Sequence, residues 1–207
     1  MDFILIIGAL LFSLSSLYFL FTYKGSQRLN VPFLVSFITL ISYLVMWQGN
    51  FVTLNSNGQE LYWTRWIGYM FSCTLLMYTI AKSIKSSQSM LTNKVYLTVL
   101  VMFTGVLASI SESNFMLMFF AVSTFAYILL IWPIITNKLA YKYINYFIVL
   151  GWSVFPVVFI LSPEGFNVIT QPVSAAIYLA LDLFTKIIFY VANSKVDLEN
   201  KDAELSQ

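Results

Sequence analysis

The sequence predicts an all-α membrane protein, a bundle of seven transmembrane helices with its N-terminus outside the cell and its C-terminus in the cytoplasm. Three observations predict this fold class: the composition, a series of long apolar stretches, and an uneven distribution of basic residues between the loops. Of the 207 residues, 59% are hydrophobic and 10% are charged. That balance excludes a soluble globular domain and indicates a multi-pass protein of the cell membrane, in contact with lipid.

Seven apolar stretches, separated by short polar segments, follow one another along the chain. Each is close to the ~20 residues that a helix needs to cross hydrocarbon, where a helix satisfies its own backbone hydrogen bonds. The first stretch lacks a basic start and a small-residue cleavage site, so we expect it to remain as a helix rather than to be removed as a signal peptide. The expected spans are 3–22, 31–48, 61–81, 95–110, 114–135, 144–162 and 172–193.

The charges of the loops alternate in sign from one side of the predicted membrane to the other. The first, third and fifth loops and the C-terminal tail contain Lys24, Arg28, Lys82, Lys85, Lys94, Lys138, Lys142, Lys195 and Lys201. The N-terminus and the other loops contain Asp2, Glu60, Glu112 and Glu164 instead. Because basic loops stay in the cytoplasm, this pattern predicts the orientation given above. The predicted domains are a seven-helix domain over residues 1–194 and a polar cytoplasmic tail over 195–207.

Three kinds of chemistry are excluded by residue counts. The chain has no histidine and a single cysteine, Cys73. We therefore expect no metal site, no internal disulfide and no histidine-based acid–base catalysis. Neither an enzyme active site nor nucleic-acid binding is predicted.

Three charged residues remain inside the predicted spans: Arg65, Asp182 and Lys186. Asp182 and Lys186 are four residues apart and therefore share one helical face. Charged groups at membrane depth are costly unless paired, so the pair is either a packing contact or a functional site. The predicted topology places Arg65 near the same outer side, and we expect the three residues to form one charge cluster. We expect Glu164, in an outer loop, to be solvated, and Glu60 likewise.

The motifs of the last two spans resemble those of the microbial (type 1) rhodopsins. Trp152-Ser153-Val154-Phe155-Pro156 is similar to their sixth-helix motif, and Asp182-Leu183-Phe184-Thr185-Lys186 is similar to their seventh-helix motif. The resemblance implies that Lys186 binds the chromophore all-trans-retinal as a protonated Schiff base, with Asp182 as counterion. It further implies a light-driven ion transporter or photoreceptor, and a homotrimer. The expected pocket residues are Tyr69, Leu76, Phe120, Ser123, Thr124, Tyr127, Trp152, Phe155, Pro156 and Thr185.

The third span differs from that of the outward proton pumps of this family at two positions. Those pumps have an aspartate three residues after the arginine, where this chain has Gly68, and a carboxylate donor where it has Thr79. Ser72 and Cys73 instead resemble the schizorhodopsins, which move protons inward and, like this chain, have a lone seventh-helix aspartate. The expected transport residues are Arg65, Gly68, Ser72, Cys73, Thr79 and Asp182.

Inward proton transport is accordingly the expected function, and two other functions stay open. Schizorhodopsins have Phe and Glu where this chain has Gly68 and Thr79, a difference that favours a photosensor or slow photoswitch without net transport. Chloride transport is the other alternative, because Gly68 is expected to leave space for a water or an anion beside a net positive cluster. The remaining alternative is a seven-helix transporter that does not bind retinal.

Overall fold

The computed structural model describes residues 1–22, 30–49, 51–54, 58–83, 86–136 and 142–193. The predicted tail over 195–207 lies outside the described residues. The same holds for six of the basic residues on which the orientation depends: Lys24, Arg28, Lys85, Lys138, Lys195 and Lys201.

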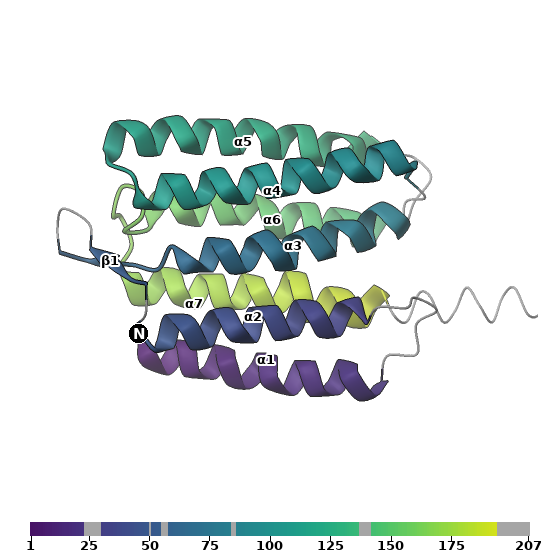
Figure 1. Ribbon diagram of the computed structural model, residues 1–207, viewed down its shortest axis with the longest axis horizontal. Helices are drawn as coiled ribbons and strands as arrows, with labels where there is room; N and C mark the ends of the chain where they lie inside the picture. The colour runs from purple at the N-terminus through teal and green to yellow at the C-terminus, as the bar shows by residue number, and fades with distance from the viewer. Residues whose placement is uncertain (23–29, 50, 55–57, 84–85, 137–141, 194–207) are drawn as a thin grey trace, which may run out of the picture.

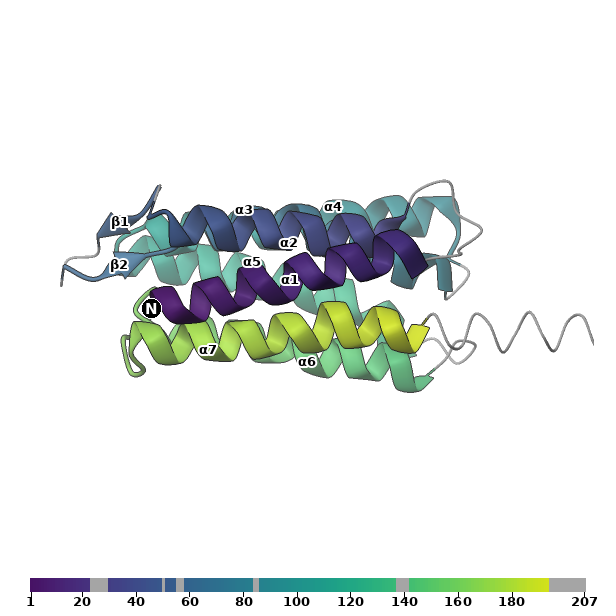
Figure 2. The same cartoon turned by 90° about the horizontal axis from the view of Figure 1, so that it is seen from below.

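Within the described residues, seven helices run side by side along one long axis and form the bundle (Figure 1). Helices that follow one another in the sequence pack together, and the last helix closes the bundle by packing on the first (Figure 2). Two antiparallel strands of two residues each, β1 (Thr53–Leu54) and β2 (Glu60–Leu61), form a hairpin that projects from one end of the bundle. The helices are α1 (Asp2–Thr22), α2 (Val31–Trp47), α3 (Thr64–Ser83), α4 (Gln88–Ile110), α5 (Ser113–Thr136), α6 (Lys142–Leu161) and α7 (Gln171–Asp182), which continues as the π-helical segment η1 (Leu183–Ile188).

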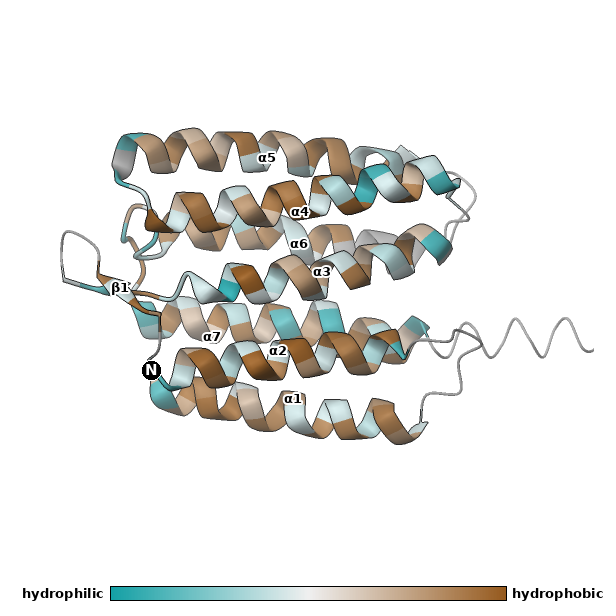
Figure 3. Cartoon of the chain, viewed as in Figure 1, coloured by the Kyte–Doolittle hydropathy of each residue, from teal (hydrophilic) through white to brown (hydrophobic). Residues whose placement is uncertain are grey.

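The all-helical class is confirmed, and apolar residues dominate the helices (Figure 3). Four helical segments are long and apolar enough to cross a membrane: Asp2–Thr22, Gln88–Ile110, Asn114–Thr136 and Gln171–Asn193. Two shorter apolar helices are Val31–Trp47 and Val149–Leu161. Hydrophilic bands interrupt the apolar surface of α7 near its middle, where a membrane helix would otherwise be apolar (Figure 3).

The fourth helix begins earlier than the sequence predicts. The expected loop over 82–94 is largely helical, because α4 starts at Gln88. Ser87 caps this start, and its side chain accepts a hydrogen bond from the backbone N–H of Met90 at 3.3 Å. Lys94, expected in the loop, is consequently a helical residue, and its side chain is buried.

Close contact between α1 and α2 positions one side chain for the site. The ring of Tyr43 on α2 packs against Gly8 on α1, where a Cβ atom would collide with that ring. Asn30 joins the same two helices: its Oδ1 accepts from the Phe33 N–H at 3.1 Å and its Nδ2 donates to the Phe19 carbonyl at 2.7 Å. Glycine at position 8 therefore lets Tyr43 lie flat against α1 and reach the middle of the bundle.

Candidate functional site

Asp182 and Lys186 meet in the middle of the bundle, as their spacing predicts. Lys186 Nζ donates to Asp182 Oδ1 at 2.6 Å, and each side chain is 1% exposed. The other carboxylate oxygen, Oδ2, accepts hydrogen bonds from the Tyr43 hydroxyl at 2.9 Å and from the Tyr69 hydroxyl at 3.0 Å. Lys186 Nζ also lies 4.2 Å from the centre of the Tyr69 ring. A buried ion pair persists only with such additional partners, since desolvation of two charges is costly.

Lys186 lies within the π-helical segment η1. π-Helical turns inside α-helices are rare and occur frequently at functional sites. Thr185, beside it, donates from Oγ1 to the Leu181 carbonyl at 2.8 Å. Its methyl group faces the Cα of Gly151 on α6, where a Cβ would lie 2.6 Å from Thr185 Cγ2. Small Gly151 thus lets η1 and α6 approach closely at the level of the lysine.

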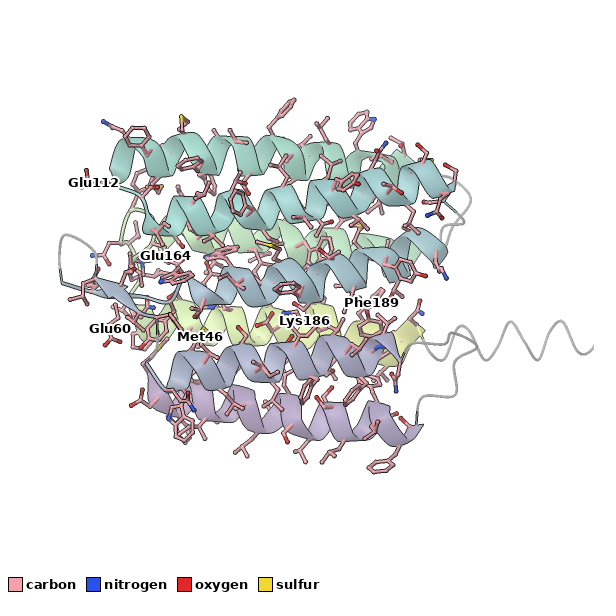
Figure 4. All side chains as sticks on the ribbon, viewed as in Figure 1. Met46, Glu60, Glu112, Glu164, Lys186 and Phe189 are labelled. Atoms are coloured by element: carbon pink, nitrogen blue, oxygen red, sulfur yellow. The ribbon has the colours of Figure 1, made fainter. Side chains whose placement is uncertain are left out.

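Arg65 has a charged partner of its own toward the hairpin end of the bundle. Its guanidinium pairs with Glu164 at 3.9 Å and lies 4.2 Å from the centre of the Tyr178 ring. Trp66 Nε1 donates to Glu164 Oε2 at 2.8 Å. Figure 4 shows Glu164 near the hairpin and Lys186 farther into the bundle. The ion pair of Arg65 is with Glu164, a partner that the sequence did not predict, and Arg65 also interacts electrostatically with Tyr43 and Tyr69, the two tyrosines that bind Asp182.

The expectation that Glu164 is solvated is wrong, because this residue is only 6% exposed. The chain after α6 turns back on itself, with Phe166 N–H donating to the Ile160 carbonyl at 2.8 Å. Glu164 N–H donates to Ser162 Oγ at 3.2 Å, which keeps the carboxylate beneath the turn. Glu60, by contrast, is exposed as expected, and its Oε2 accepts from the Tyr62 hydroxyl at 2.5 Å.

The buried carboxyl group of Glu164 gives a pH-dependent contribution to stability. Burial raises its pKa above the ordinary value of 4.5, although Arg65 and the Trp66 N–H oppose this. The folded state then holds the proton more tightly than the unfolded state, so the contribution is largest below pH 4.5 and is lost as pH rises through the folded pKa. We expect the difference between the two melting temperatures, that of the native chain minus that of Glu164→Gln, to decrease as pH rises above 4.5. Thermal unfolding of both proteins in detergent at a series of pH values measures this difference.

Glu112→Gln is the matched control, because Glu112 is an exposed loop carboxylate. Its melting temperature is expected to follow that of the native chain at every pH. A difference between the native chain and Glu164→Gln that is constant, or that grows with pH, contradicts the prediction.

A cavity of about 680 Å³, its open mouth included, lies between α3, α4, α5 and α6. Most of the pocket residues that the sequence predicts line this cavity, and so does the predicted transport residue Cys73. The lining residues are Trp66, Tyr69, Cys73, Val101, Met102, Gly105, Ala108, Phe120, Ser123, Thr124, Tyr127, Leu130, Trp152, Phe155, Pro156 and Phe159.

Two predicted pocket residues do not line the cavity, and the contribution of α4 to its lining was not predicted. Leu76 is fully buried in the hydrophobic core, and Thr185 packs against Gly151; neither lines the cavity. The α4 wall, which includes Met102 and Gly105, was not predicted. Gly105 admits the Trp66 ring, since a Cβ at this position would lie 3.2 Å from it. No motif identifies this wall, because apolar and small residues are ordinary in any membrane helix.

The remaining predicted transport residues lie along α3. Ser72 Oγ donates to the Gly68 carbonyl at 2.9 Å, and the side chain of Ser72 is fully buried. Thr79, farther toward the other end, donates from Oγ1 to the Leu75 carbonyl at 3.2 Å and lies 3.3 Å from the Tyr190 hydroxyl.

Gly68 does not leave the space that was expected beside the charged residues. A Cβ there would lie 2.5 Å from Ser42 Oγ and 2.7 Å from Ser42 Cβ on α2. The position of the missing side chain is thus filled by protein, and Gly68 serves the close packing of α2 on α3. The expectation of room for a water or an anion at Gly68 is corrected, and the chloride alternative loses this part of its support.

Gly68→Ala is expected to destabilise the fold by about 1–3 kcal/mol, the usual cost of overpacking a core. Because Ser42 Oγ has no hydrogen-bond partner among the described residues, Ser42→Gly removes the clash without breaking a bond. The double variant Ser42→Gly/Gly68→Ala should therefore recover most of the loss. Thermal unfolding of the three variants in detergent measures both effects, and an undiminished cost in the double variant counts against this packing account.

Comparison with protein families matches residues 1–194 to the family described as bacteriorhodopsin-like protein. The chain belongs to this family. A crystal structure of schizorhodopsin 4 superposes with a TM-score of 0.88 at 36% sequence identity, covering 93% of this chain and 97% of that one. The thermophilic rhodopsin from Rubrobacter xylanophilus has the same fold, with a TM-score of 0.82, 23% identity, and 91% and 92% of the two chains covered. Bacteriorhodopsin of Halobacterium salinarum is 24% identical over 89% of this chain and 79% of its own.

This microbial rhodopsin therefore comes from a family of light-driven retinal proteins of membranes. The residues present fit such a chromophore. The cavity is lined mostly by apolar and aromatic side chains, and Tyr69 both lines it and contacts the Lys186 amine. A carboxylate beside that amine can neutralise a positive charge on the nitrogen.

Proposed function

We propose that this rhodopsin binds all-trans-retinal through Lys186 and, under light, moves protons from the outside of the cell to the cytoplasm. The observation that carries the proposal is the asymmetry around Lys186 Nζ. Asp182 is its carboxylate partner at 2.6 Å, while α3 presents Gly68 and Thr79 where outward pumps have carboxylates. The similarity to schizorhodopsin 4 supports the same direction.

Each residue of the central group has a distinct task in this proposal. Retinal, when bound, supplies absorption of visible light and a light-driven change of shape within the cavity. Lys186 provides the amine nitrogen that forms the covalent link and holds the proton. Asp182 stabilises that positive charge, and the hydroxyls of Tyr43 and Tyr69 fix the carboxylate in place through its second oxygen.

The direction of transport follows from what Asp182 can and cannot do. Light-driven separation of Lys186 Nζ from Asp182 weakens the interaction that holds the proton. Asp182 is the carboxylate that contacts Lys186, and its Oδ2 already accepts two hydrogen bonds, from Tyr43 and Tyr69. The proton then passes toward the cytoplasm along Ser72, Cys73 and Thr79, and a proton from the outside replaces it.

The outer charged group defines the opposite side of this route. Arg65, Trp66 and Glu164 close the hairpin end of the bundle with an ion pair and a hydrogen bond between buried groups. We place this end outside the cell, following the distribution of basic residues, with seven transmembrane helices and the C-terminus in the cytoplasm. A homotrimer in the cell membrane completes the proposed arrangement.

Light-induced pH change in a suspension of cells that express the protein tests the proposal. With retinal added, illumination should make the medium more alkaline, and a protonophore should abolish the change. Acidification of the medium would refute the proposed direction. The same cells expressing Lys186→Ala provide the background.

The second candidate function is a photoswitch without net transport, and Thr79 is the observation that favours it. No carboxylate contacts Thr79 among the described residues; its polar neighbour on another helix is Tyr190. If proton release to the cytoplasm is slow for this reason, the photocycle lasts long and transports little. A visible band that light bleaches for seconds, without any pH change in the medium, would support this candidate.

Thr79→Glu is expected to accelerate inward transport by about tenfold or more, because a positioned carboxylate gives the proton a local acceptor on the cytoplasmic side. Thr79→Gln, of nearly equal size but without a titratable group, should leave the rate unchanged. The initial rate of alkalinisation per mole of chromophore measures the effect. Equal rates in both variants would show that proton release at this position does not limit transport.

A further inference from the structure

Thr124 on α5 has a hydroxyl group that the fold does not use. Its Oγ1 is buried and makes no hydrogen bond within the described part of the chain. Hydroxyl side chains elsewhere in the bundle donate to the carbonyl one turn earlier, as Thr98 does to Lys94 at 2.8 Å and Thr104 to Leu100 at 2.7 Å. The Thr124 hydroxyl does not make this hydrogen bond, and Thr124 lines the cavity. An unsatisfied buried hydroxyl costs about 1–3 kcal/mol, so a partner in the cavity is favoured.

Thr124 lies on the α5 wall of the cavity, and α5 is not among the helices that pack against the segment containing Lys186. α5 packs between α4 and α6, whereas α7 and η1 pack against α1, α2 and α6. Figure 1 shows α5 along one edge of the bundle, with α4 and α3 drawn between it and α7. A linear ligand linked to Lys186 and filling the cavity therefore ends beside α5, where retinal has its ring.

The other hydroxyl groups at this end already have acceptors. Ser123 Oγ donates to the Val101 carbonyl at 2.9 Å, and Ser153 Oγ donates to the Val149 carbonyl at 2.8 Å. The Tyr127 hydroxyl lies 2.9 Å from Ser153 Oγ and 3.2 Å from the Val149 carbonyl. Thr124 is thus the hydroxyl among these four that still lacks an acceptor.

We propose that this end of the cavity selects a retinal whose ring carries an oxygen acceptor, such as a ring carbonyl, and that the Thr124 hydroxyl donates to it. The inference rests on the proposed attachment of retinal to Lys186. The ring carbonyl is the chemical class that fits, because it offers lone pairs to the Thr124 donor, whereas the Ser123 and Tyr127 hydroxyls already have acceptors. An apolar ring leaves the Thr124 hydroxyl unpaired.

Competition between retinals tests the inference. All-trans-retinal and 4-oxoretinal are supplied in equal amounts to a limiting quantity of the full chain, and the bound ratio is determined by extraction and chromatography. We expect the native chain to favour 4-oxoretinal by about 2- to 10-fold more than Thr124→Val does, the usual effect of one hydrogen bond. Thr124→Ser, which keeps the hydroxyl, should retain the preference. 4-Methylretinal, similar in size but without an acceptor, should not be preferred.

Three outcomes contradict the inference, and they can be told apart. Equal ratios for the native chain and Thr124→Val show that the hydroxyl selects nothing. A matching preference for 4-methylretinal shows that size alone decides. The absence of a visible band with every retinal contradicts the proposed function itself, whereas a band with all of them leaves that function intact.

Discussion

Lys186→Ala is expected to abolish the visible absorption band that forms when retinal is added to the protein. The Lys186 amine is buried, lies 2.6 Å from Asp182, and contacts Tyr69 of the cavity wall. No other lysine is described beside the cavity, so removal of this nitrogen leaves no group to form the covalent link. Absorption spectra of the purified variant with added retinal measure the effect, which should be complete rather than partial.

Lys94→Ala is the matched control for this loss. Lys94 is also a buried lysine, 3% exposed, but it lies near the start of α4 and donates to Ser86 Oγ at 3.3 Å. Its removal should leave the band unchanged. A band that survives Lys186→Ala, or that disappears equally in both variants, would contradict the assignment of Lys186.

Asp182→Asn is expected to remove the negative charge that stabilises the proton on Lys186 Nζ, and to stop transport. Loss of one partner from a buried ion pair costs about 3–5 kcal/mol, because the other charge remains in a medium of low polarity. The positive charge on the nitrogen then has no carboxylate partner, and we expect the absorption to move from the visible range to the near ultraviolet. Asparagine keeps the shape of the side chain and can still accept from Tyr43 or Tyr69 through its amide oxygen.

Glu164→Gln is the control for the loss of a buried carboxylate as such. Glu164 is buried like Asp182, but its ion pair is with Arg65 at the end of the bundle. This variant should retain a visible band. Unchanged absorption and continued transport in Asp182→Asn would show that the charge of Asp182 is not needed.

Local spacing was sufficient to predict the central ion pair. Asp182 and Lys186 lie one helical turn apart, so any helix brings them together. The same holds for the expected spans, whose ends differ from the helices by a few residues except at α4. There a polar first turn resembled a loop, yet Ser87 caps the helix and Lys94 is buried.

Contacts between distant segments could not be predicted in the same way. Nothing in the local sequence shows that the turn after α6 buries Glu164 against Trp66, since an outer-loop glutamate is ordinarily solvated. Likewise, the Gly68 position is filled by Ser42, a residue of another helix. The contact of the Tyr43 ring with Gly8, a residue of another helix, is likewise what brings the Tyr43 hydroxyl to Asp182.

The direction of the photocurrent at zero applied voltage tests the central claim most directly. In whole-cell recordings from cells that express the protein and are supplied with retinal, light is predicted to drive an inward current. The current should persist when chloride is replaced by an impermeant anion, and it should vanish in Asp182→Asn. An outward current would contradict the account, because it would require a proton acceptor on the outer side that Gly68 does not provide.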